Sequence, residues 1–299
     1  MTSSRLRLIL AFLAIYVLWG STYLAIRVAV ETVPPLYAAG LRFLIAGTLL
    51  YGWSSARGAA QPSRLQWRNL SILAVLLFLI AYSGLFWAEK TLPSGVASVL
   101  VATTPVWTAA LEIFVFRRQR FRWTLAAALA GGLGGVALMA FHGASGASPR
   151  ACLVILGCDI AWALGTVLTP MLALPKSKTL GAGAQMMLGG LMLLAAAALV
   201  GEMTPWPRVS LHAAAAIAYL VVAGSLIAFT AYEWLLTTQV PATTVTSYAY
   251  VNPVVAILIG YGLGHEALSL RIVLGTTVVL SSVVLLVRRD GSASGPRDR

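Results

Sequence analysis

Aromatic and small polar residues recur inside the long apolar stretches of this sequence, and they are the residues best suited to bind a small molecule. Aromatic faces hold apolar or cationic groups, while hydroxyl and amide groups orient a polar head. Helix packing and an interfacial aromatic belt are the alternative explanation. Asn252 is the strongest polar candidate, because an amide in hydrocarbon needs partners. The predicted binding residues are Trp19, Thr22, Tyr82, Phe86, Thr104, Trp162, Thr166, Tyr248 and Asn252.

Charged residues within the same stretches are few, and Arg42 and Asp159 are the deepest of them. A rise of about 1.5 Å per residue puts each roughly 10 Å inside the outer leaflet of the predicted membrane. Buried charges there are costly and are therefore candidates for function. The two residues could pair with each other, or Arg42 could pair with Glu89. Asp159 is the one carboxylate suited to proton coupling, and transport driven by the substrate gradient alone is an equally open alternative.

Signatures of covalent chemistry are missing from the sequence. It contains no phosphate-cradling loop, no zinc-ligand spacing and no nucleophile elbow, so neither an ATP-driven pump nor a membrane hydrolase is supported. Cys152 and Cys158 lie six positions apart on one predicted helix, which fits neither a disulfide nor a metal site. We predict no catalytic residue, no metal and no cofactor, and we expect that the protein is not an enzyme.

The elements that must position these residues are membrane-spanning helices. The 299 residues are 59% hydrophobic and 10% charged, with a mean hydropathy of +0.86, whereas soluble domains carry about 25% charge. A spanning helix needs about 20 apolar residues. The sequence predicts an all-α polytopic membrane protein with ten such helices at 7–28, 35–54, 69–88, 94–116, 122–141, 151–171, 181–201, 211–234, 242–263 and 269–287.

The basic residues give an orientation. The formal net charge is +12, and most of the 21 Lys and Arg residues fall in loops that share one side if the N-terminus is cytoplasmic. This positive-inside bias predicts that both termini are cytoplasmic. The basicity therefore indicates contact with lipid headgroups, and we expect no nucleic-acid partner.

An internal repeat divides the sequence into residues 1–148 and 149–299. Segment 92–94 aligns with 240–242, and 104–106 with 252–254, and each pair shares a central proline. Five helices in each half is an odd number, so the second half must enter the membrane from the opposite side. Two inverted five-helix repeats are a common plan for secondary transporters, with the substrate bound where the halves meet.

Pro105 and Pro253 are predicted to interrupt corresponding helices of the two halves. Proline removes a backbone donor, and the carbonyl this leaves unpaired is tolerated in a membrane only where it faces protein or a wet cavity. We predict kinks at both positions, which would serve as hinges beside the binding site.

Four segments resemble the drug/metabolite transporter superfamily, and within it the EamA-type bacterial exporters: LWGSTYLAIR (18–27), PPLYAAGLRFLIAG (34–47), AEKTLPSGVASVLVATTPVW (88–107) and TSYAYVNPVVAILIGYGLGHEALS (246–269). The resemblance implies ten helices in two inverted repeats. It also implies alternating-access export of amino acids, aromatic ones included, and related metabolites through the bacterial inner membrane. The sequence departs from the pattern in one place: Glu266 follows the ninth predicted helix, but Arg118 stands in that register after the fourth.

Two other functions stay open. A carrier for phosphorylated sugars or nucleotide-sugars would need several cations in its cavity to hold phosphate, and Arg42 is the only well-placed one. A membrane scaffold or enzyme without transport activity would keep its function when the cavity is blocked. The expected partners are a small-molecule substrate and membrane lipid, and the protein acts as a monomer or a homodimer.

Overall fold

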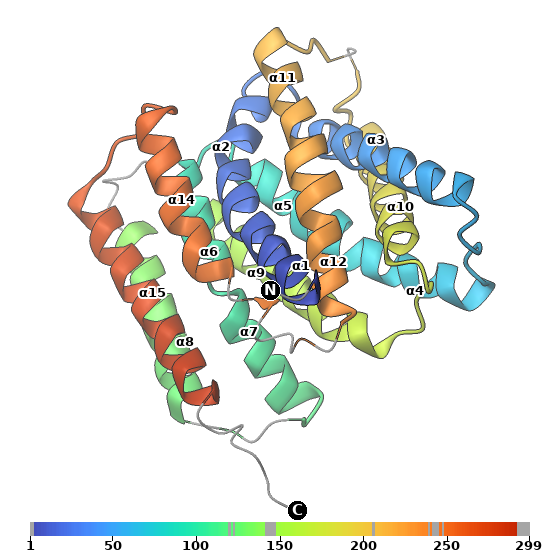
Figure 1. The fold of residues 1–299 in the computed structure, drawn as a ribbon. Helices are drawn as coiled ribbons and strands as arrows, with labels where there is room; N and C mark the ends of the chain where they lie inside the picture. The colour runs from blue at the N-terminus through green and yellow to red at the C-terminus, as the bar shows by residue number, and fades with distance from the viewer. Residues whose placement is uncertain are drawn as a thin grey trace, which may run out of the picture.

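The computed structural model describes residues 3–118, 121, 123–140, 148–204, 207–238, 240, 245–246 and 248–291. Within these ranges the chain is helical and contains no strand (Figure 1). The segment 241–244, which holds the second copy of the repeated prolyl turn and the start of the ninth predicted span, lies outside the described residues.

Several of the long helices change their winding partway along. The segments η1, η2, η3 and η5 are π-helical, and η4 is a short 3₁₀ turn. In chain order the elements are α1 (Ser3–Leu13), η1 (Ala14–Leu18), α2 (Trp19–Val30), α3 (Pro35–Ala56), α4 (Arg64–Ala74), η2 (Val75–Ile80), α5 (Ala81–Ala88), α6 (Ser94–Val101), α7 (Thr104–Ala110), η3 (Leu111–Val115), α8 (Trp123–Ala140), α9 (Pro149–Leu168), η4 (Thr169–Met171), α10 (Lys178–Leu199), α11 (Leu211–Tyr219), η5 (Leu220–Phe229), α12 (Thr230–Leu236), α14 (Tyr248–Gly262) and α15 (Leu270–Gly291).

Seven helical segments in the described part of the chain are long and apolar enough to cross a membrane. They are Arg5–Val30, Pro35–Ala56, Arg64–Ala88, Ser94–Val115, Pro149–Met171, Lys178–Leu199 and Leu211–Leu236. Two shorter apolar helices follow, Val251–Gly262 and Leu270–Ser281. The prediction of a helical, polytopic membrane protein is confirmed, and the count of ten spans stays a prediction.

Serine and proline define several helix starts in the loops. Ser63 and Gln66 form a reciprocal capping box at the start of α4, and Ser177 accepts a hydrogen bond from the Leu180 backbone at the start of α10. Pro35 opens α3, at a position where a helix needs no backbone donor. These residues fix where each helix begins at the edge of the apolar region.

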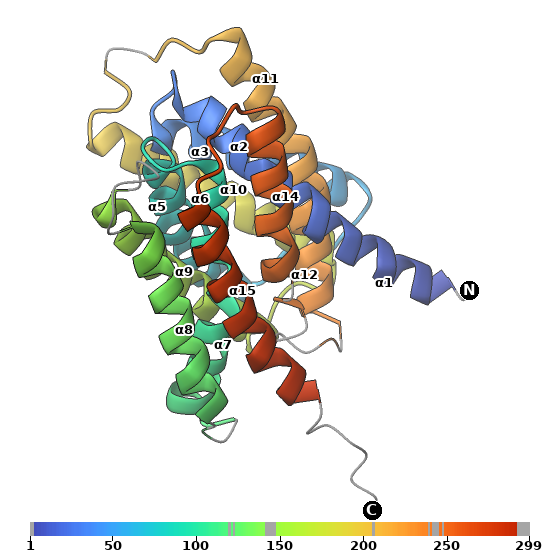
Figure 2. The ribbon, with the colours of Figure 1, turned by 90° about the vertical axis from the view of Figure 1, so that its left-hand side faces the viewer.

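The helices pack in neighbouring pairs. α3 lies against α10, α6 against α14, α5 against α9 and α2 against α11. α8 and α15 run side by side at one edge of the molecule in both ribbon views (Figures 1 and 2). The α3–α10 contact is very close, because a Cβ at Gly47 would lie 2.7 Å from the Met187 Cα atom and one at Gly183 would lie 2.6 Å from the Tyr51 backbone nitrogen. Small residues of this kind let helix backbones approach in membranes.

The two repeated prolines have different local structures. The helix is broken before Pro105: α6 ends at Val101, Ala102 and Thr103 form a turn, and Pro105 lies in the first turn of α7. Backbone donors in a first turn have no partner in any helix, so proline costs little there. Pro253 instead lies inside α14.

Candidate functional site

A cavity lies among the central helices. It encloses about 550 Å³ of space outside protein atoms, part of it open to the surroundings. Side chains from α2, α5, α9 and α14 form most of its wall, with Val101 at the end of α6. The lining residues are Trp19, Thr22, Tyr23, Ile26, Ala81, Tyr82, Leu85, Val101, Ile155, Cys158, Asp159, Trp162, Tyr248 and Asn252.

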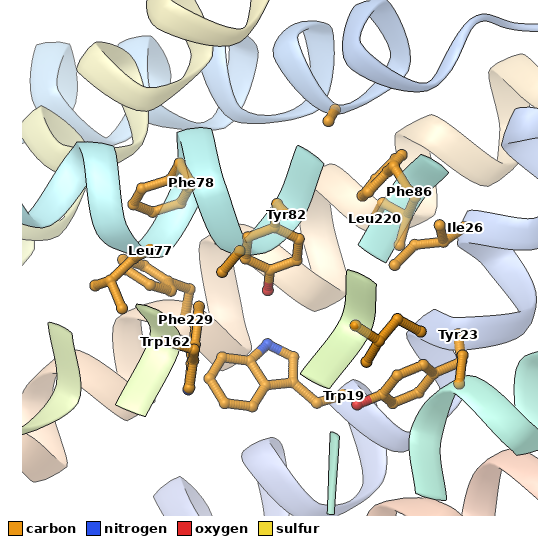
Figure 3. Packing of buried hydrophobic residues seen from close by; sticks show 14 of the residues in the cluster. Trp19, Tyr23, Ile26, Leu77, Phe78, Tyr82, Phe86, Trp162, Leu220 and Phe229 are labelled. Atoms are coloured by element: carbon orange, nitrogen blue, oxygen red, sulfur yellow. The ribbon is translucent and has the colours of Figure 1, made fainter. Parts of the chain in front are cut away.

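Five aromatic rings belong to the wall, and Trp19 packs against two of them as well as against Tyr232 behind the wall. Its ring centroid lies 5.0 Å from Tyr232, 5.0 Å from Tyr248 and 5.7 Å from Trp162. Figure 3 shows the Tyr82 hydroxyl pointing toward the Trp19 indole. Tilted and edge-on contacts at these distances are the favoured geometry for aromatic pairs.

Hydrogen bonds hold two of the indoles in place. Trp19 Nε1 donates to the carbonyl of Gly224 (3.0 Å), and Trp162 Nε1 donates to Tyr248 Oη (2.9 Å). Their N–H groups are therefore satisfied by the protein, and the ring surfaces remain to contact a bound molecule. The wall is thus built before a ligand arrives.

Asp159 is the only charged residue among the described residues that line the cavity. Its side chain is 3% exposed. The hydroxyl of Thr103 donates to Asp159 Oδ2 at 3.0 Å, and that of Thr104 donates to Oδ1 at 2.5 Å. A molecule that enters the cavity therefore meets a carboxyl group that is shielded from solvent and already has two hydroxyl partners.

The break between α6 and α7 positions these two hydroxyls. Thr103 lies in the turn and Thr104 is the first residue of α7, so their side chains face α9 and Asp159 together. Trp107, one turn further along α7, donates from Nε1 to Thr103 Oγ1 at 3.1 Å. The helix break before Pro105 thus places the two hydroxyl groups that hydrogen-bond Asp159.

Arg42 is fully buried in α3 and lies behind the cavity wall. Its Nε donates to Ser225 Oγ at 2.9 Å, and its Cζ lies 4.5 Å and 5.2 Å from the ring centroids of Phe43 and Tyr82. In the described part of the chain Arg42 forms no ion pair with Asp159 or Glu89, although Arg42 and Glu89 are close enough for their opposite charges to attract each other. The nearest neighbours of Asp159 are hydroxyl groups, and those of Arg42 are a hydroxyl group and two ring faces.

Asn252 joins α14 to the first helix. It is buried, and with its amide nitrogen turned toward the first helix it donates to the carbonyls of Tyr16 (2.9 Å) and Ile15 (3.1 Å). Both carbonyls belong to η1, and a π-helical turn changes the backbone hydrogen-bond register. Asn252 thus satisfies backbone acceptors next to the cavity.

Three predicted binding residues lie behind the wall. Phe86 is fully buried, with its ring 6.3 Å from that of Tyr82. Thr104 holds Asp159, and Thr166 is buried and hydrogen-bonded to Tyr232 Oη and to the Trp162 carbonyl. The structure brings Trp19, Thr22, Tyr82, Trp162, Tyr248 and Asn252 to the lining together with Asp159. That any of these residues binds substrate stays a prediction.

Several lining residues were not among the nine predicted binding residues. Tyr23 lies four positions after Trp19, and Ile26 follows three positions later on the same face of α2. Leu85 stands in the same relation to Tyr82. Residues three and four apart share a helix face, so extending each candidate by one turn would have found them.

A second polar group gathers at the start of α6 and consists of Arg27, Glu89 and Glu266. Glu266 Oε1 and Oε2 accept hydrogen bonds from the backbone nitrogens of Ser94 (2.8 Å) and Gly95 (3.3 Å). Arg27 Nε lies 3.6 Å from Glu266 Oε1, and its Nη1 donates to the Leu92 carbonyl. A carboxylate at a helix N-terminus is favoured by the helix dipole. Glu266 therefore ties the loop after α14 to α6.

Glu89, at the C-terminal end of α5, is fully buried beside this group. Burial and then the negative charge of Glu266 raise the pKa of Glu89 well above its ordinary value of 4.5, and Arg27 offsets only part of this. The raised pKa favours the protonated form of Glu89.

Comparison with known proteins gives consistent matches over nearly the whole chain. The model of the EamA-like transporter family matches residues 6–141 and again 149–288. The uncharacterized inner membrane transporter YedA of Escherichia coli strain K12 is 38% identical over 279 residues, which cover 92% of this chain and 89% of YedA. Protein PecM of Dickeya dadantii is 27% identical, over 90% of this chain and 88% of PecM.

A solved structure shares the fold. A crystal structure of a protein aligns with a TM-score of 0.65 at 22% identity and covers 95% of this chain and 98% of that one.

Proposed function

Because the chain belongs to the EamA-like transporter family, we propose that it exports amino acids and related small metabolites through the bacterial inner membrane. Aromatic and hydrophobic amino acids are the expected substrates, with other neutral ones besides. The observation that carries this proposal is the ring-lined cavity, most of whose wall comes from helices of membrane-spanning length. The name of the relative YedA supports the choice of the inner membrane.

The cavity has the properties of a small-molecule site. Its wall is mostly apolar, and its few polar groups come from Thr22, Asp159, Tyr248 and Asn252 and their neighbours. Rings suit an apolar side chain, and the polar groups suit the charged end of an amino acid.

We further propose that residues 1–148 and 149–299 are inverted repeats with both termini in the cytoplasm. Two matches to one family model support this division. So does the packing, since α3 and α10 are each the second predicted span of their half and lie against each other, as do α8 and α15, each the fifth. Alternating access would then be a rocking of the two halves around the cavity, with the break before Pro105 and the segment around Pro253 as hinges.

A carrier for phosphorylated sugars or nucleotide-sugars is the second candidate. Its cavity would need cations to hold phosphate. The described lining contains none, and the guanidinium of Arg42 lies behind Tyr82. We therefore rank this function lower. Strong competition by a sugar phosphate against amino-acid counterflow would reverse the order.

The direct test is counterflow in proteoliposomes that contain the purified chain, with a panel of labelled neutral amino acids. We expect flux above that of empty vesicles for phenylalanine and similar substrates. Tyr248→Arg, which puts a charge into the cavity, should abolish it, whereas Tyr261→Arg on the exposed outer end of the same helix should not. Flux that survives Tyr248→Arg would point to a function that does not use the cavity.

The two native cysteines allow a second test. Cys158 lines the cavity, and Cys152 is buried six positions earlier on α9. In a Cys152→Ala background, a small thiol reagent should label Cys158, and substrate should slow that labelling. Labelling of Cys158 at the same rate with and without a transported amino acid would place the substrate elsewhere.

A further inference from the structure

We infer that the transported molecule is recognised through a protonated amine, and that this amine displaces a proton from Asp159. The chain would then exchange ammonium-bearing substrates for protons. This inference rests on the proposed transport function and narrows it, because it names the part of the substrate that is bound and the ion that drives export.

The first reason is the charge of the cavity. Asp159 is the one charged side chain on the described lining, and no cation shares that wall with it. An isolated carboxylate is very unfavourable in a buried site unless it is neutralised or paired. The charge of Arg42 is directed to the hydroxyl of Ser225 and to the rings of Phe43 and Tyr82. A proton or a cationic ligand must therefore balance Asp159.

The second reason is the number of hydrogens available around the carboxyl group. A hydroxyl has one hydrogen to donate, but each threonine has two acceptors in reach. Thr103 Oγ1 lies 2.8 Å from the Leu100 carbonyl as well as 3.0 Å from Asp159. Thr104 Oγ1 lies 2.6 Å from the Val101 carbonyl as well as 2.5 Å from Asp159. With Asp159 ionised, four acceptors compete for two hydrogens.

A proton on Asp159 removes this competition. The carboxylic acid then donates to Thr104 Oγ1, and Thr104 donates to the Val101 carbonyl. The other carboxyl oxygen still accepts from Thr103, and the Leu100 carbonyl keeps its bond from the Thr103 backbone nitrogen (3.1 Å). The empty cavity therefore holds a carboxylic acid.

An ammonium group can replace that proton. It brings three donors and a positive charge, so it satisfies both oxygens of the carboxylate while the threonine hydroxyls return to the carbonyls. Rings of Trp19, Tyr23, Tyr82 and Tyr248 share the cavity and attract a cation through their faces. The proton leaves to the side that the cavity faces, so the charge on Asp159 stays balanced throughout the exchange.

Other ionisable groups near Asp159 are less suited to this exchange. The phenols of Tyr23, Tyr82 and Tyr248 and the thiol of Cys158 share the lining, but both group types ordinarily titrate above neutral pH. The other charged residues on or directly after the described lining helices are Arg27 near the end of α2, Glu89 at the end of α5 and Arg150 at the start of α9. None of these three lines the cavity.

The first experiment compares three compounds that share a phenyl ring: phenylalanine, phenethylamine and 3-phenylpropionate. Each competes with labelled phenylalanine in counterflow by the wild-type chain in liposomes. We expect phenethylamine to compete within a few-fold of phenylalanine, and 3-phenylpropionate to be at least about tenfold weaker. Equal competition by the acid and the amine would overturn the inference. This comparison uses only the wild-type chain, so it does not depend on whether a variant folds.

The second experiment measures proton release when phenylalanine is added to the purified chain in weakly buffered detergent. Wild-type protein should release about one proton per bound substrate. Asp159→Asn should release none, and its competition by phenethylamine should fall at least about tenfold. Glu233→Gln is the matched control, because Glu233 is also a buried acid in a spanning helix, bonded to Gln185, and it does not line the cavity. Proton release by Asp159→Asn at the wild-type level would contradict the inference.

The outcomes separate the inference from the proposed function. If the wild-type chain transports no amino acid, the proposed function fails. If phenylalanine is transported without proton release and without preference for the amine, the proposed function stands and the inference fails. Where Asp159→Asn does not fold, as judged by its melting curve, Asp159→Glu takes its place, and it should keep the proton release while binding substrate more weakly.

Discussion

The two proline-containing segments began as matching patterns in the sequence, and they have become different structures. In segment 94–115 the helix breaks before Pro105, and the break presents two hydroxyls to Asp159. In segment 248–262 the helix continues through Pro253, and the residue before the proline, Asn252, is bound to carbonyls of the first helix. One segment shapes the charged part of the cavity, and the other anchors its wall.

This difference shows that a proline near the middle of an apolar stretch does not by itself end a helix. The contact made beside each proline depends on the polar residue next to it. Threonines next to a break can turn toward another helix, whereas an asparagine inside a continuous helix can reach the carbonyls of the helix beside it.

The largest effect is expected from replacing the two prolines. Pro105→Ala lets α6 and α7 join into one helix and moves Thr103 and Thr104 away from Asp159, so amino-acid counterflow should fall by about tenfold or more. Pro253→Ala adds a backbone donor inside an existing helix, so this segment should be the weaker of the two hinges and flux should fall by only about twofold. Equal losses in the two variants would show that the two hinges contribute equally to transport.

Removing the polar groups should separate binding from stability. The double variant Thr103→Val/Thr104→Val leaves Asp159 without its hydroxyl partners, and flux should fall by roughly fivefold or more. Asn252→Leu should mainly lower the free energy of unfolding, by about 1–3 kcal/mol, because buried carbonyls lose their donor. Counterflow and thermal melting in detergent measure both quantities. A double variant with wild-type flux would remove the functional role assigned to the break.

A smaller effect on stability is expected from removing the contact between Glu266 and the N-terminus of α6. Glu266→Gln weakens the carboxylate contact with the N-terminus of α6 and the pairing with Arg27, which is one-third exposed. The expected loss is about 0.5–1 kcal/mol of stability. Lys90→Gln is a control that removes an exposed charge in the same loop region. A melting temperature that does not differ between these variants would mean that the Glu266 contact contributes nothing measurable.

The smallest effect is expected on the pH dependence of the melting temperature. Because Glu89 has a raised pKa in the folded chain, its contribution to stability is fully present below the ordinary pKa of 4.5 and is lost as the pH rises through the raised value. Glu89→Gln should therefore flatten the decline of melting temperature with rising pH. An unchanged pH dependence in this variant would show that Glu89 is not the group responsible.

Composition and apolar run length were enough to predict most of the membrane-spanning segments, because hydrocarbon admits only helices with internally satisfied backbones. The spacing of Trp19, Tyr82, Trp162 and Tyr248 also located much of the cavity wall. These features depend on local properties of the chain.

The partners of the buried charges could not be predicted in the same way. Asp159 meets Thr103 and Thr104, and Arg42 meets Ser225 nearly two hundred positions away. Such contacts depend on how helices rotate and cross, which a single sequence does not contain. Electrostatic attraction suggested an Arg42–Asp159 pair, but Asp159 contacts two hydroxyl groups, and Arg42 contacts a hydroxyl group and two ring faces.

The π-helical segment η1 has a consequence for the length of the first span. A π turn holds one more residue than an α turn, so deleting any one residue within Ala14–Leu18 would restore regular winding. The faces of α1 and α2 would keep nearly the same directions, because a π turn accommodates its extra residue within one turn of the helix. The carbonyls of Ile15 and Tyr16, which accept from Asn252, would instead change their pairing within the helix. The extra residue in this span therefore serves the Asn252 contact and leaves the direction of α1 unchanged.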